Sequence, residues 1–363
     1  MVTMIYYKDK KYNFVEYFDE VTGVLVRSNV LKNSVETCEM PKMRSFPELI
    51  DIGIMGTCVS AENKICKNAG IDCYQNASKR KRPNMSYEDY CKIIEQSKNK
   101  TFQVALGGSG DPNKHEYFGD ILATTRKNFI VPNLTTSGMG MTDSEVSLMK
   151  KYCGAVAVSY YSKLNHNGEE DNPSTISAIN KLVDAGCVTN VHYVLSKKNI
   201  KEALYRLDNN LFPNGINAII FLLYKPVGLA SKENMLSYLD LEYIELIKSV
   251  SRYQLNFSIG FDSCQSPAIN MFSKDVAAES IQFCDAARFS MYIDCEMKAH
   301  PCSFGIETSN YSFDLKANTL EAAWDSASFQ KFRDKQVSSC SYCDILHCRN
   351  CALELDINVC GAV

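Results

Sequence analysis

Cysteine is the residue type in this sequence that is best suited to chemistry, by number and by position. The chain has 363 residues and 16 cysteines, of which nine fall between positions 264 and 360. Its first residues contain no apolar run of the kind that directs export, so we expect a cytoplasmic protein. Structural disulfides are disfavoured in the reducing cytosol, and dense cysteines then indicate metal ligands or catalysis. Thiolates are the soft ligands that iron–sulfur clusters require.

The first cysteine group is Cys58, Cys66 and Cys73, directly after an apolar strand-like segment. Three thiolates can hold three corners of a four-iron cluster and leave the fourth iron open to a small molecule. A structural zinc site is the alternative, but zinc usually has four ligands with a short C-x2-C pair, which this segment lacks. We therefore predict a cluster here, without Cys38, which precedes the strand.

The second cysteine group lies near the end of the chain and contains the run C-x2-C-x4-C-x2-C. Alone, this run would also fit a zinc ribbon. The group as a whole offers enough thiolates for two four-ligand sites, because it comprises Cys264, Cys284, Cys295, Cys302, Cys340, Cys343, Cys348, Cys351 and Cys360. Cys153 and Cys187 lie next to apolar segments, and we expect them to be small buried hydrophobes.

Short apolar strands alternate with amphipathic helices from residue 50 to residue 250. The pattern predicts strands at 50–55, 102–106, 130–136, 155–160, 188–195 and 217–223, and helices at 87–97, 116–127, 144–152, 174–185, 199–207 and 241–250. Such alternation is typical of a parallel sheet with covering helices. Six units without a dinucleotide-binding fingerprint favour an α/β fold of the partial (β/α)6 barrel type, in which chemistry lies at the carboxyl ends of the strands.

Polar motifs follow the second, third and fourth of these strands. The second strand ends in Gly107 and Gly108, and Asp111 follows them. Glycines at a strand end let a ligand approach the backbone, and a carboxylate beyond them could receive an ammonium group. A simple turn role for Asp111 is the alternative. The third and fourth strands end near Thr136 and Ser159.

Together, the cysteine triad and these motifs resemble the radical S-adenosylmethionine superfamily over residues 48–260. The triad is C-x7-C-x6-C, whereas that family usually has C-x3-C-x2-C. The segment GGSGDP occupies the place of the family's Gly-Gly-Glu-Pro motif. The resemblance implies that S-adenosylmethionine chelates the open iron of a [4Fe-4S] cluster. It also implies that Gly107, Gly108 and Asp111 hold the methionine amino group, and that Thr136 and Ser159 contact its ribose or carboxylate.

Residues 261–363 resemble the SPASM extension of radical enzymes that modify peptides and proteins. The resemblance implies two auxiliary [4Fe-4S] clusters, which makes three in total. By position, one would use Cys264, Cys284, Cys302 and Cys351, and the other Cys340, Cys343, Cys348 and Cys360. Cys295 could replace Cys264 in the first of these sets. We expect three units: an N-terminal hairpin over 1–47, the partial barrel over 48–260 and the cysteine-rich extension over 261–363.

The resemblance implies a peptide substrate. It favours a ribosomally made precursor peptide that receives a thioether or carbon–carbon crosslink. Oxidation of a protein in the manner of anaerobic sulfatase maturases is the alternative. A non-enzymatic zinc or iron–sulfur electron-transfer protein is an alternative of another class. Flavodoxin or ferredoxin would supply electrons. The N-terminal hairpin could pair with a leader peptide through its edge, or simply cap the bottom of the barrel.

Charge and hydropathy exclude several other classes of partner. The net charge is -3 and the pI is about 6.0, whereas partners such as nucleic acids and anionic membranes usually require a basic excess. No stretch approaches the ~20 apolar residues of a membrane span. We therefore expect neither a nucleic-acid partner nor a membrane segment.

Overall fold

The structure is a computed structural model that describes residues 4–277, 280–307, 309–338 and 351–361. Three of the predicted cluster ligands, Cys340, Cys343 and Cys348, lie outside the described residues. No helix within the described ranges is both long enough and apolar enough to cross a bilayer.

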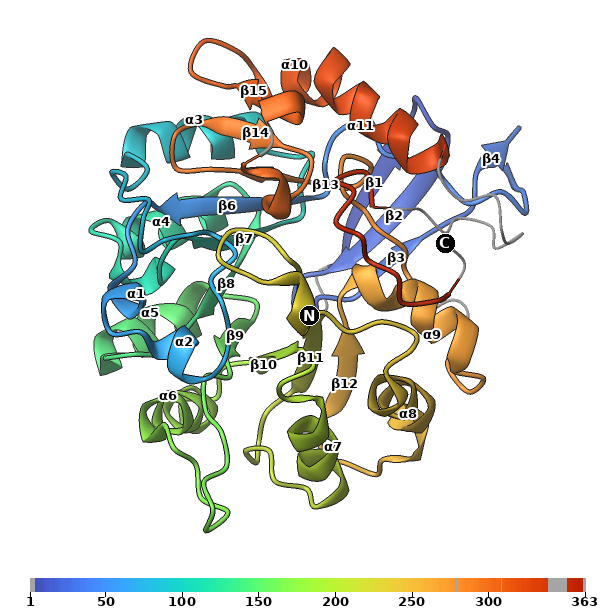
Figure 1. Cartoon of the computed structure of the whole chain (residues 1–363). Helices are drawn as coiled ribbons and strands as arrows, with labels where there is room; N and C mark the ends of the chain where they lie inside the picture. Colours follow the sequence, from blue (N-terminus) through green and yellow to red (C-terminus); the bar gives the residue numbers. More distant parts are fainter. Residues whose placement is uncertain (1–3, 278–279, 308, 339–350, 362–363) are drawn as a thin grey trace.

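A mixed sheet forms the centre of the molecule (Figure 1). Within the described ranges it has ten strands in the order β12-β11-β10-β9-β8-β7-β6-β13-β14-β15, and the run from β6 to β12 is parallel throughout. The sheet curves but does not close into a full barrel. The strands are β6 (Leu49–Met55), β7 (Gln103–Gly108), β8 (Val131–Thr136), β9 (Val156–Ser159), β10 (Thr189–Leu195), β11 (Ala218–Leu223), β12 (Ser258–Phe261), β13 (Ser290–Ile293), β14 (Lys298–His300) and β15 (Phe313–Asp314).

All six predicted parallel strands are confirmed, and β12 is a seventh that the sequence pattern did not reveal. It has only four residues, and its Gly260 interrupts the apolar run that would mark a strand. A Cβ atom at Gly260 would lie 2.8 Å from Cδ1 of Ile220 on β11, so a larger residue there would require the Ile220 side chain to shift.

Helices cover the outer face of this sheet (Figure 1). The six predicted helices are confirmed, and capping residues fix several of their starts: Thr142 and Glu145 form a reciprocal capping box at the first turn of α5. The covering helices are α3 (Tyr87–Ser97), α4 (Phe118–Lys127), α5 (Asp143–Tyr152), α6 (Pro173–Asp184), α7 (Ile200–Asp208) and α8 (Leu241–Ser249). The other helices are α1 (Val59–Glu62), α2 (Ile65–Asn68), α9 (Ser266–Phe272), α10 (Leu320–Trp324) and α11 (Ala327–Ser338).

The alternation of side chains along β6 separates a packed face from an inner face. Ile50, Ile52 and Ile54 are fully buried in the main hydrophobic core with the covering helices. Successive side chains of a strand point to opposite faces, so Asp51 and Gly53 face the concave interior of the sheet. We call this interior the lumen, and it is where the strand ends present their polar residues.

The C-terminal region shares the central sheet rather than standing apart from it. Strand β13 pairs in parallel with β6, with Tyr292 opposite Asp51, and β14 and β15 follow antiparallel. The predicted unit boundary at residue 260 falls inside strand β12. Strand pairing continues across this boundary, because β13 pairs with β6. The division of the chain into units remains a prediction.

The N-terminal segment forms a separate three-stranded antiparallel sheet of β1 (Met4–Asp9), β2 (Phe14–Asp19) and β3 (Leu25–Arg27), followed by the short pair β4 (Leu31–Lys32) and β5 (Val35–Glu36). The predicted hairpin corresponds to β2 and β3, and β1 was missed. The Phe18 ring stacks on Phe102, just before β7, at 5.2 Å between centroids. Glu16 pairs with Arg44 at 2.7 Å, both fully buried. These contacts place the sheet at the amino ends of the parallel strands.

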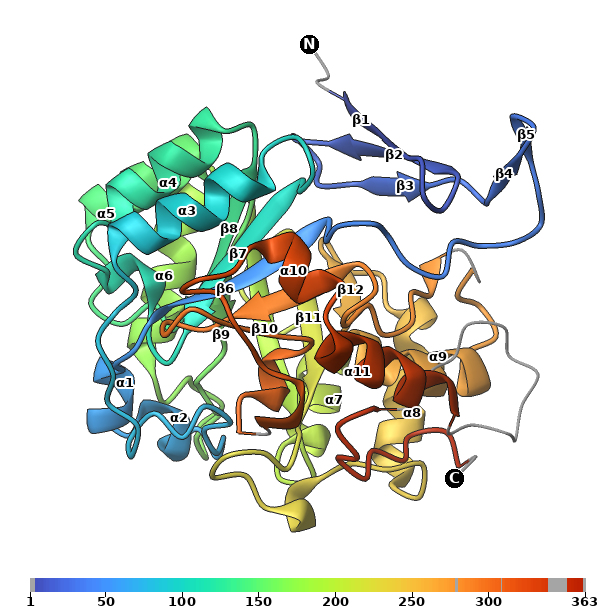
Figure 2. The ribbon, with the colours of Figure 1, turned by 90° about the horizontal axis from the view of Figure 1, so that it is seen from above.

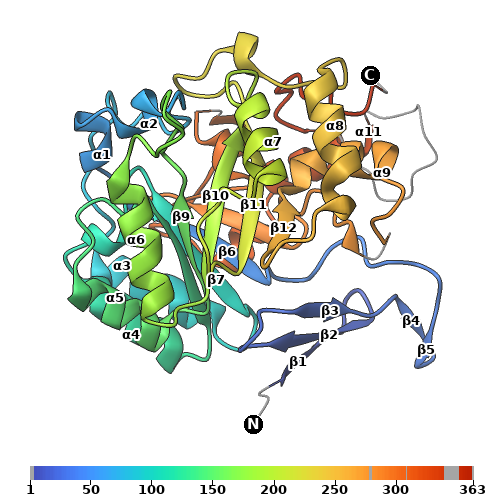
Figure 3. The ribbon, with the colours of Figure 1, turned by 90° about the horizontal axis from the view of Figure 1, so that it is seen from below.

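Figures 2 and 3 show this small sheet at the end of the molecule opposite α1 and α2. That position corresponds to a cap on the bottom of the barrel, one of the two roles expected for the segment. Pairing of its edge with a leader peptide remains a prediction.

Candidate functional site

The first cysteine group lies in the loop that follows β6 and carries the short helices α1 and α2. Cys58 is the N-cap of α1, where its Sγ accepts a hydrogen bond from the Ala61 amide at 3.3 Å. Cys66 lies within α2, and Cys73 follows that helix. A Cβ atom at Gly56 would lie 2.2 Å from the Pro83 carbonyl oxygen, so the loop leaves the sheet in close contact with the segment before α3.

The three thiols of this loop are close enough to influence one another's ionisation. Burial, together with the charges of Cys73 and Cys58, raises the pKa of Cys66 to about 12. Burial also raises the pKa of Cys58, and the charges of Asp111 and Cys73 contribute to this increase. Buried thiols that repel each other as thiolates need a cation between them to ionise together. Cys38, by contrast, is exposed and precedes β6, as predicted for a cysteine outside the group.

Glycines shape the carboxyl end of β7 next to this loop. Gly108 has a φ of +119°, and a Cβ atom there would lie 2.7 Å from the Met55 carbonyl oxygen. A Cβ atom at Gly110 would lie 2.1 Å from the Thr57 carbonyl oxygen, so only glycine allows the two loops to touch. Gly107 faces open space, with no atom within 4 Å of such a Cβ. The backbone at Gly107 is therefore accessible to a ligand.

Asp111 connects the end of β7 to the end of β8. Its carboxylate accepts hydrogen bonds from the amide and the hydroxyl of Ser137, both at 2.6 Å, and a long one from the Ser60 hydroxyl at 3.5 Å. An ionised carboxylate has about four acceptor positions, so these bonds leave capacity for an ammonium group. Ser137 and Ser60 are site residues that the sequence reasoning missed, although Ser137 lies directly beside the predicted Thr136.

Thr136 and Ser159 end neighbouring strands but differ in their surroundings. The Thr136 side chain is buried, donates to Asn113 at 2.8 Å and accepts from the Gly138 amide at 3.0 Å. Ser159 donates a hydrogen bond to the Tyr161 hydroxyl, which in turn donates to the Cys66 thiol. Ser159 is thus connected to the cysteine loop through one side chain. The contacts of Thr136 and Ser159 with a cofactor remain predictions.

A second group of thiols lies where β12, β13 and the C-terminal segment converge. Burial raises the pKa of Cys264 well above its usual range, with added contributions from Cys284 and Cys302. Burial likewise raises the pKa of Cys302 to about 12 and of Cys284 to about 11, and the charge of Cys351 acts on both. The structure therefore brings together the four cysteines assigned to one auxiliary cluster: Cys264, Cys284, Cys302 and Cys351.

Cys295 lies apart from this group. It occupies the turn between β13 and β14, where burial and the Asp294 charge raise its thiol pKa and the Arg82 charge lowers it. Cys360 lies on the other side of the group, where its charge and that of Cys264 both raise the pKa of Tyr243. Cys153 and Cys187 pack against the main core, as expected for small hydrophobes.

Within the described ranges, no three histidine, cysteine, aspartate or glutamate side chains are close enough together to bind a single metal ion. A four-iron cluster binds each thiolate at a different iron and so accepts ligands that are further apart. The two cysteine groups fit such a cluster by donor type and by their mutual electrostatic influence.

Between the two groups lies a set of side chains that sequence reasoning did not single out. Tyr74 follows Cys73, and its ring lies 4.9 Å from that of Phe304, two residues after Cys302. Lys225 lies 4.5 Å above the Phe304 ring and pairs with Asp262 at 2.5 Å. Aromatic residues after a cysteine are common, and no sequence signal marked these as neighbours.

Asp51 is the other residue of the lumen that was missed. Burial raises its pKa from 3.8 to about 7, and it has no hydrogen-bond or ion-pair partner in the described part of the chain. Its position in the middle of an apolar strand was the available signal, because a carboxylate there has to face a polar interior.

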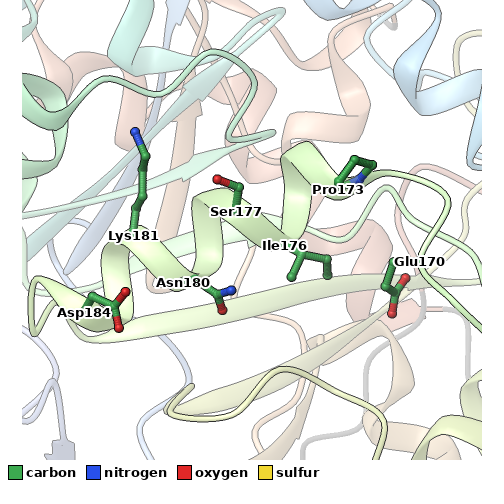
Figure 4. A pocket seen from close by; sticks show the side chains of 7 residues that line it. All are labelled: Glu170, Pro173, Ile176, Ser177, Asn180, Lys181 and Asp184. Carbon is green, nitrogen blue, oxygen red and sulfur yellow. The ribbon is translucent and has the colours of Figure 1, made fainter.

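A hollow on the outer surface of α6 lies away from the lumen (Figure 4). Glu170 and Pro173 lie at one end of it and Asp184 at the other, and the remaining side chains come from the exposed face of the helix. It contains no cysteine, so it is separate from the candidate site.

Comparison with known proteins identifies relatives by fold. No family model matches the chain, and no curated protein matches it by sequence. The crystal structure of Streptococcus suis SuiB covers 92% of this chain and 90% of its own, with a TM-score of 0.67 and 12% identity. SuiB bound to S-adenosylmethionine gives 0.63, with 15% identity over 82% of this chain and 70% of that one.

Native anSMEcpe with bound AdoMet gives a TM-score of 0.58, with 14% identity over 82% of this chain and 86% of that one. At these identities the likeness concerns the fold. The chain therefore shares its fold with SuiB and anSMEcpe.

Proposed function

We propose that this protein is a radical S-adenosylmethionine enzyme that modifies a peptide. The observation that carries the proposal is the meeting of Cys58, Cys66 and Cys73 with the Gly107–Asp111 edge of β7. The charge of Asp111 acts on two of these thiols, so the carboxylate lies beside the place where a cofactor bound to the cluster would sit. The fold shared with SuiB and anSMEcpe, both solved with this cofactor, supports the proposal.

The described residues fit two [4Fe-4S] clusters and S-adenosylmethionine, and the third proposed cluster would use three cysteines that lie outside the described residues. When bound, the first cluster supplies the electron that cleaves S-adenosylmethionine and so generates the 5′-deoxyadenosyl radical. The chain itself orients the cofactor through the open Gly107 backbone and the Asp111 carboxylate. Tyr161, which follows β9, would help to orient the Cys66 thiol, because its hydroxyl interacts with both Ser159 and Cys66.

Two auxiliary clusters complete the proposal. Cys264, Cys284, Cys302 and Cys351 would hold one, and Cys360 with Cys340, Cys343 and Cys348 the other. The charges of Lys225 and Asp262 act on Cys264 in the first of these sets, and Phe304 lies two residues after Cys302. Buried metal sites in regions with few apolar runs contribute to folding, so we assign these clusters a part in the order of the C-terminal region.

A precursor peptide is the substrate we favour, with a crosslink as product. SuiB has been solved bound to the precursor peptide SuiA, and anSMEcpe bound to the Cp18Cys peptide. Oxidation of a protein side chain, by analogy with anSMEcpe, is the second candidate. The electron donor, flavodoxin or ferredoxin, and the cytoplasmic location remain predictions.

The proposal is tested by anaerobic reconstitution followed by addition of reductant and S-adenosylmethionine. We expect a brown protein with about twelve iron atoms and twelve sulfides per chain, since each cluster contains four of each. We also expect 5′-deoxyadenosine to form. A colourless protein that binds zinc and leaves S-adenosylmethionine intact would instead support the alternative of a non-enzymatic zinc-binding protein.

Replacement of Asp111 by asparagine should weaken the binding of S-adenosylmethionine by about 1–3 kcal/mol, the usual range for a charge-assisted hydrogen bond. Asparagine keeps an oxygen that can accept from Ser137 but loses the charge that would attract an ammonium group. Equilibrium dialysis of the reconstituted protein measures the effect, and the exposed Asp120→Asn variant is the matched control. An unchanged affinity would return Asp111 to a turn role.

Replacement of Cys302 by alanine should remove about four iron atoms per chain, the content of one cluster, whereas Cys295→Ala should remove none. The reason is that Cys302 lies within the auxiliary group, and Cys295 lies in a turn beside Arg82. Iron analysis and Mössbauer spectroscopy of both variants decide the assignment. A loss of iron in Cys295→Ala together with an unchanged iron content in Cys264→Ala would show that Cys295, and not Cys264, is the cluster ligand.

A further inference from the structure

A carboxylate and two phenols face each other in the lumen between the two cysteine groups. Asp51 on β6 has Tyr292 opposite it on β13, and a Cβ atom at Gly53 would lie 2.2 Å from the Tyr292 hydroxyl oxygen. The Tyr292 side chain therefore lies over the same face of β6 as Asp51. The charge of Asp51 also acts on Tyr74, which is influenced in turn by Cys73 and Cys302. Asp51 and its neighbours thus lie within electrostatic reach of both cysteine groups.

Asp51 lies on the inner face of the sheet and keeps part of its surface accessible, and the Tyr74 side chain is 37% exposed. Among the described residues Asp51 has no hydrogen-bond donor or cation as a partner. Burying a charged group without a partner is costly, so an unpaired carboxylate on this inner face favours a ligand that completes it.

The charges around the lumen favour a cation as that ligand. Asp262 pairs with Lys225 at 2.5 Å, so this lysine is not available to neutralise Asp51. Asp51 remains without an ion-pair partner among the described residues, and thiolate-bound clusters would add negative charge. The Tyr292 hydroxyl lies over Gly53 on the same face as Asp51, and the Tyr74 side chain is partly exposed. Aromatic side chains attract a cation at short range.

We infer that Asp51, with Tyr74 and Tyr292, forms a subsite that binds the cationic side chain of a lysine or arginine in the peptide substrate. This inference rests on the proposed function and names the kind of residue that the enzyme positions between its clusters. Asp51 is a specificity-determining residue in this assignment, because it selects which side chain enters the lumen.

The test measures the binding of small amides to the reconstituted protein in the presence of S-adenosylmethionine. The probe is N-acetyl-lysine methylamide, and N-acetyl-norleucine methylamide has a chain of similar length without charge. Saturation-transfer NMR gives both dissociation constants. We expect the lysine amide to bind at least about tenfold more tightly than the norleucine amide, since a charge-assisted hydrogen bond corresponds to about tenfold or more.

Asp51→Asn should remove this preference, weakening the lysine amide about tenfold and leaving the norleucine amide unchanged. Asp51→Glu keeps the charge and should retain a preference for lysine. Asp184→Asn, on the outer surface of α6, is the matched control and should behave as the parent. Thermal unfolding of each variant verifies that it is folded.

Three results would overturn the inference: equal binding of the two amides, an unchanged affinity for lysine amide in Asp51→Asn, or no binding of lysine amide by the parent. Formation of 5′-deoxyadenosine is measured in parallel without any probe. A parent that forms no 5′-deoxyadenosine contradicts the proposed function itself. A parent that forms it while Asp51→Asn keeps full affinity for the lysine amide contradicts only the subsite.

Discussion

Replacement of Cys58, Cys66 and Cys73 by alanine should abolish the formation of 5′-deoxyadenosine. The three thiols lie in one loop at the carboxyl end of β6. The charge of Cys73 contributes to the raised pKa of both Cys58 and Cys66, and the charge of Cys58 contributes to that of Cys66. Without them the cluster that reduces S-adenosylmethionine has no ligands. Product analysis by chromatography should show at least about a thousandfold loss, since a step that depends on a cofactor retains little rate without it.

The same triple variant should lose about four iron atoms per chain, while the auxiliary clusters remain. Cys38→Ala is the control, because Cys38 is an exposed cysteine that precedes β6 and should leave both iron content and product unchanged. Circular dichroism verifies that the variant keeps its helices. Continued cleavage of S-adenosylmethionine by the triple variant would show that the assignment of this loop is wrong.

Replacement of Asp51 by asparagine makes the protein more stable, and the gain increases with pH. Burial raises the pKa of Asp51 from 3.8 to about 7, so the folded chain binds a proton at this carboxyl more tightly than the unfolded chain does. As pH rises above 3.8 the unfolded chain releases that proton first, and the parent loses stability until the pH has passed 7. Asparagine is neutral at every pH and does not incur this loss.

The full difference is on the order of 4 kcal/mol, from about 1.4 kcal/mol for each pH unit of displacement, and it is an upper bound because Asp51 keeps some contact with solvent. Most of it has accumulated by pH 6, and about 1 kcal/mol more should appear between pH 6 and pH 8. Melting temperatures of parent and Asp51→Asn across this range give the trend, and Asp184→Asn should follow the parent. A difference that is constant with pH would contradict the raised pKa.

The order of elements and the first cysteine group could be read from the sequence because both depend on neighbouring residues. Strands and helices follow from the spacing of apolar side chains, and caps such as Thr142 with Glu145 fix where helices begin. Cys58, Cys66 and Cys73 are close in sequence and occupy one loop after a recognisable strand. Short connections keep such residues close together in space, independently of how the rest of the chain folds.

Long-range pairing could not be read in this way. Strand β13 pairs with β6 across some 240 residues of sequence, and only this pairing places Tyr292 beside Asp51. Cys264 and Cys295 also lie on different paths of the chain: Cys264 follows β12 near Lys225, whereas Cys295 lies in a turn beside Arg82. Neither path leaves a periodic signal in the sequence.

The sequence by itself therefore determined the alternating architecture, the cysteine groups and the glycine-rich strand end, because local spacing and side-chain chemistry specify them. Only the tertiary structure decided that β12 extends the sheet, that Ser137 engages Asp111 and that Tyr292 and Tyr74 lie near Asp51. The physical reason is that register and packing arise from the whole core at once. A carboxylate on an apolar strand acquires its raised pKa and its proposed ligand only when distant strands enclose it.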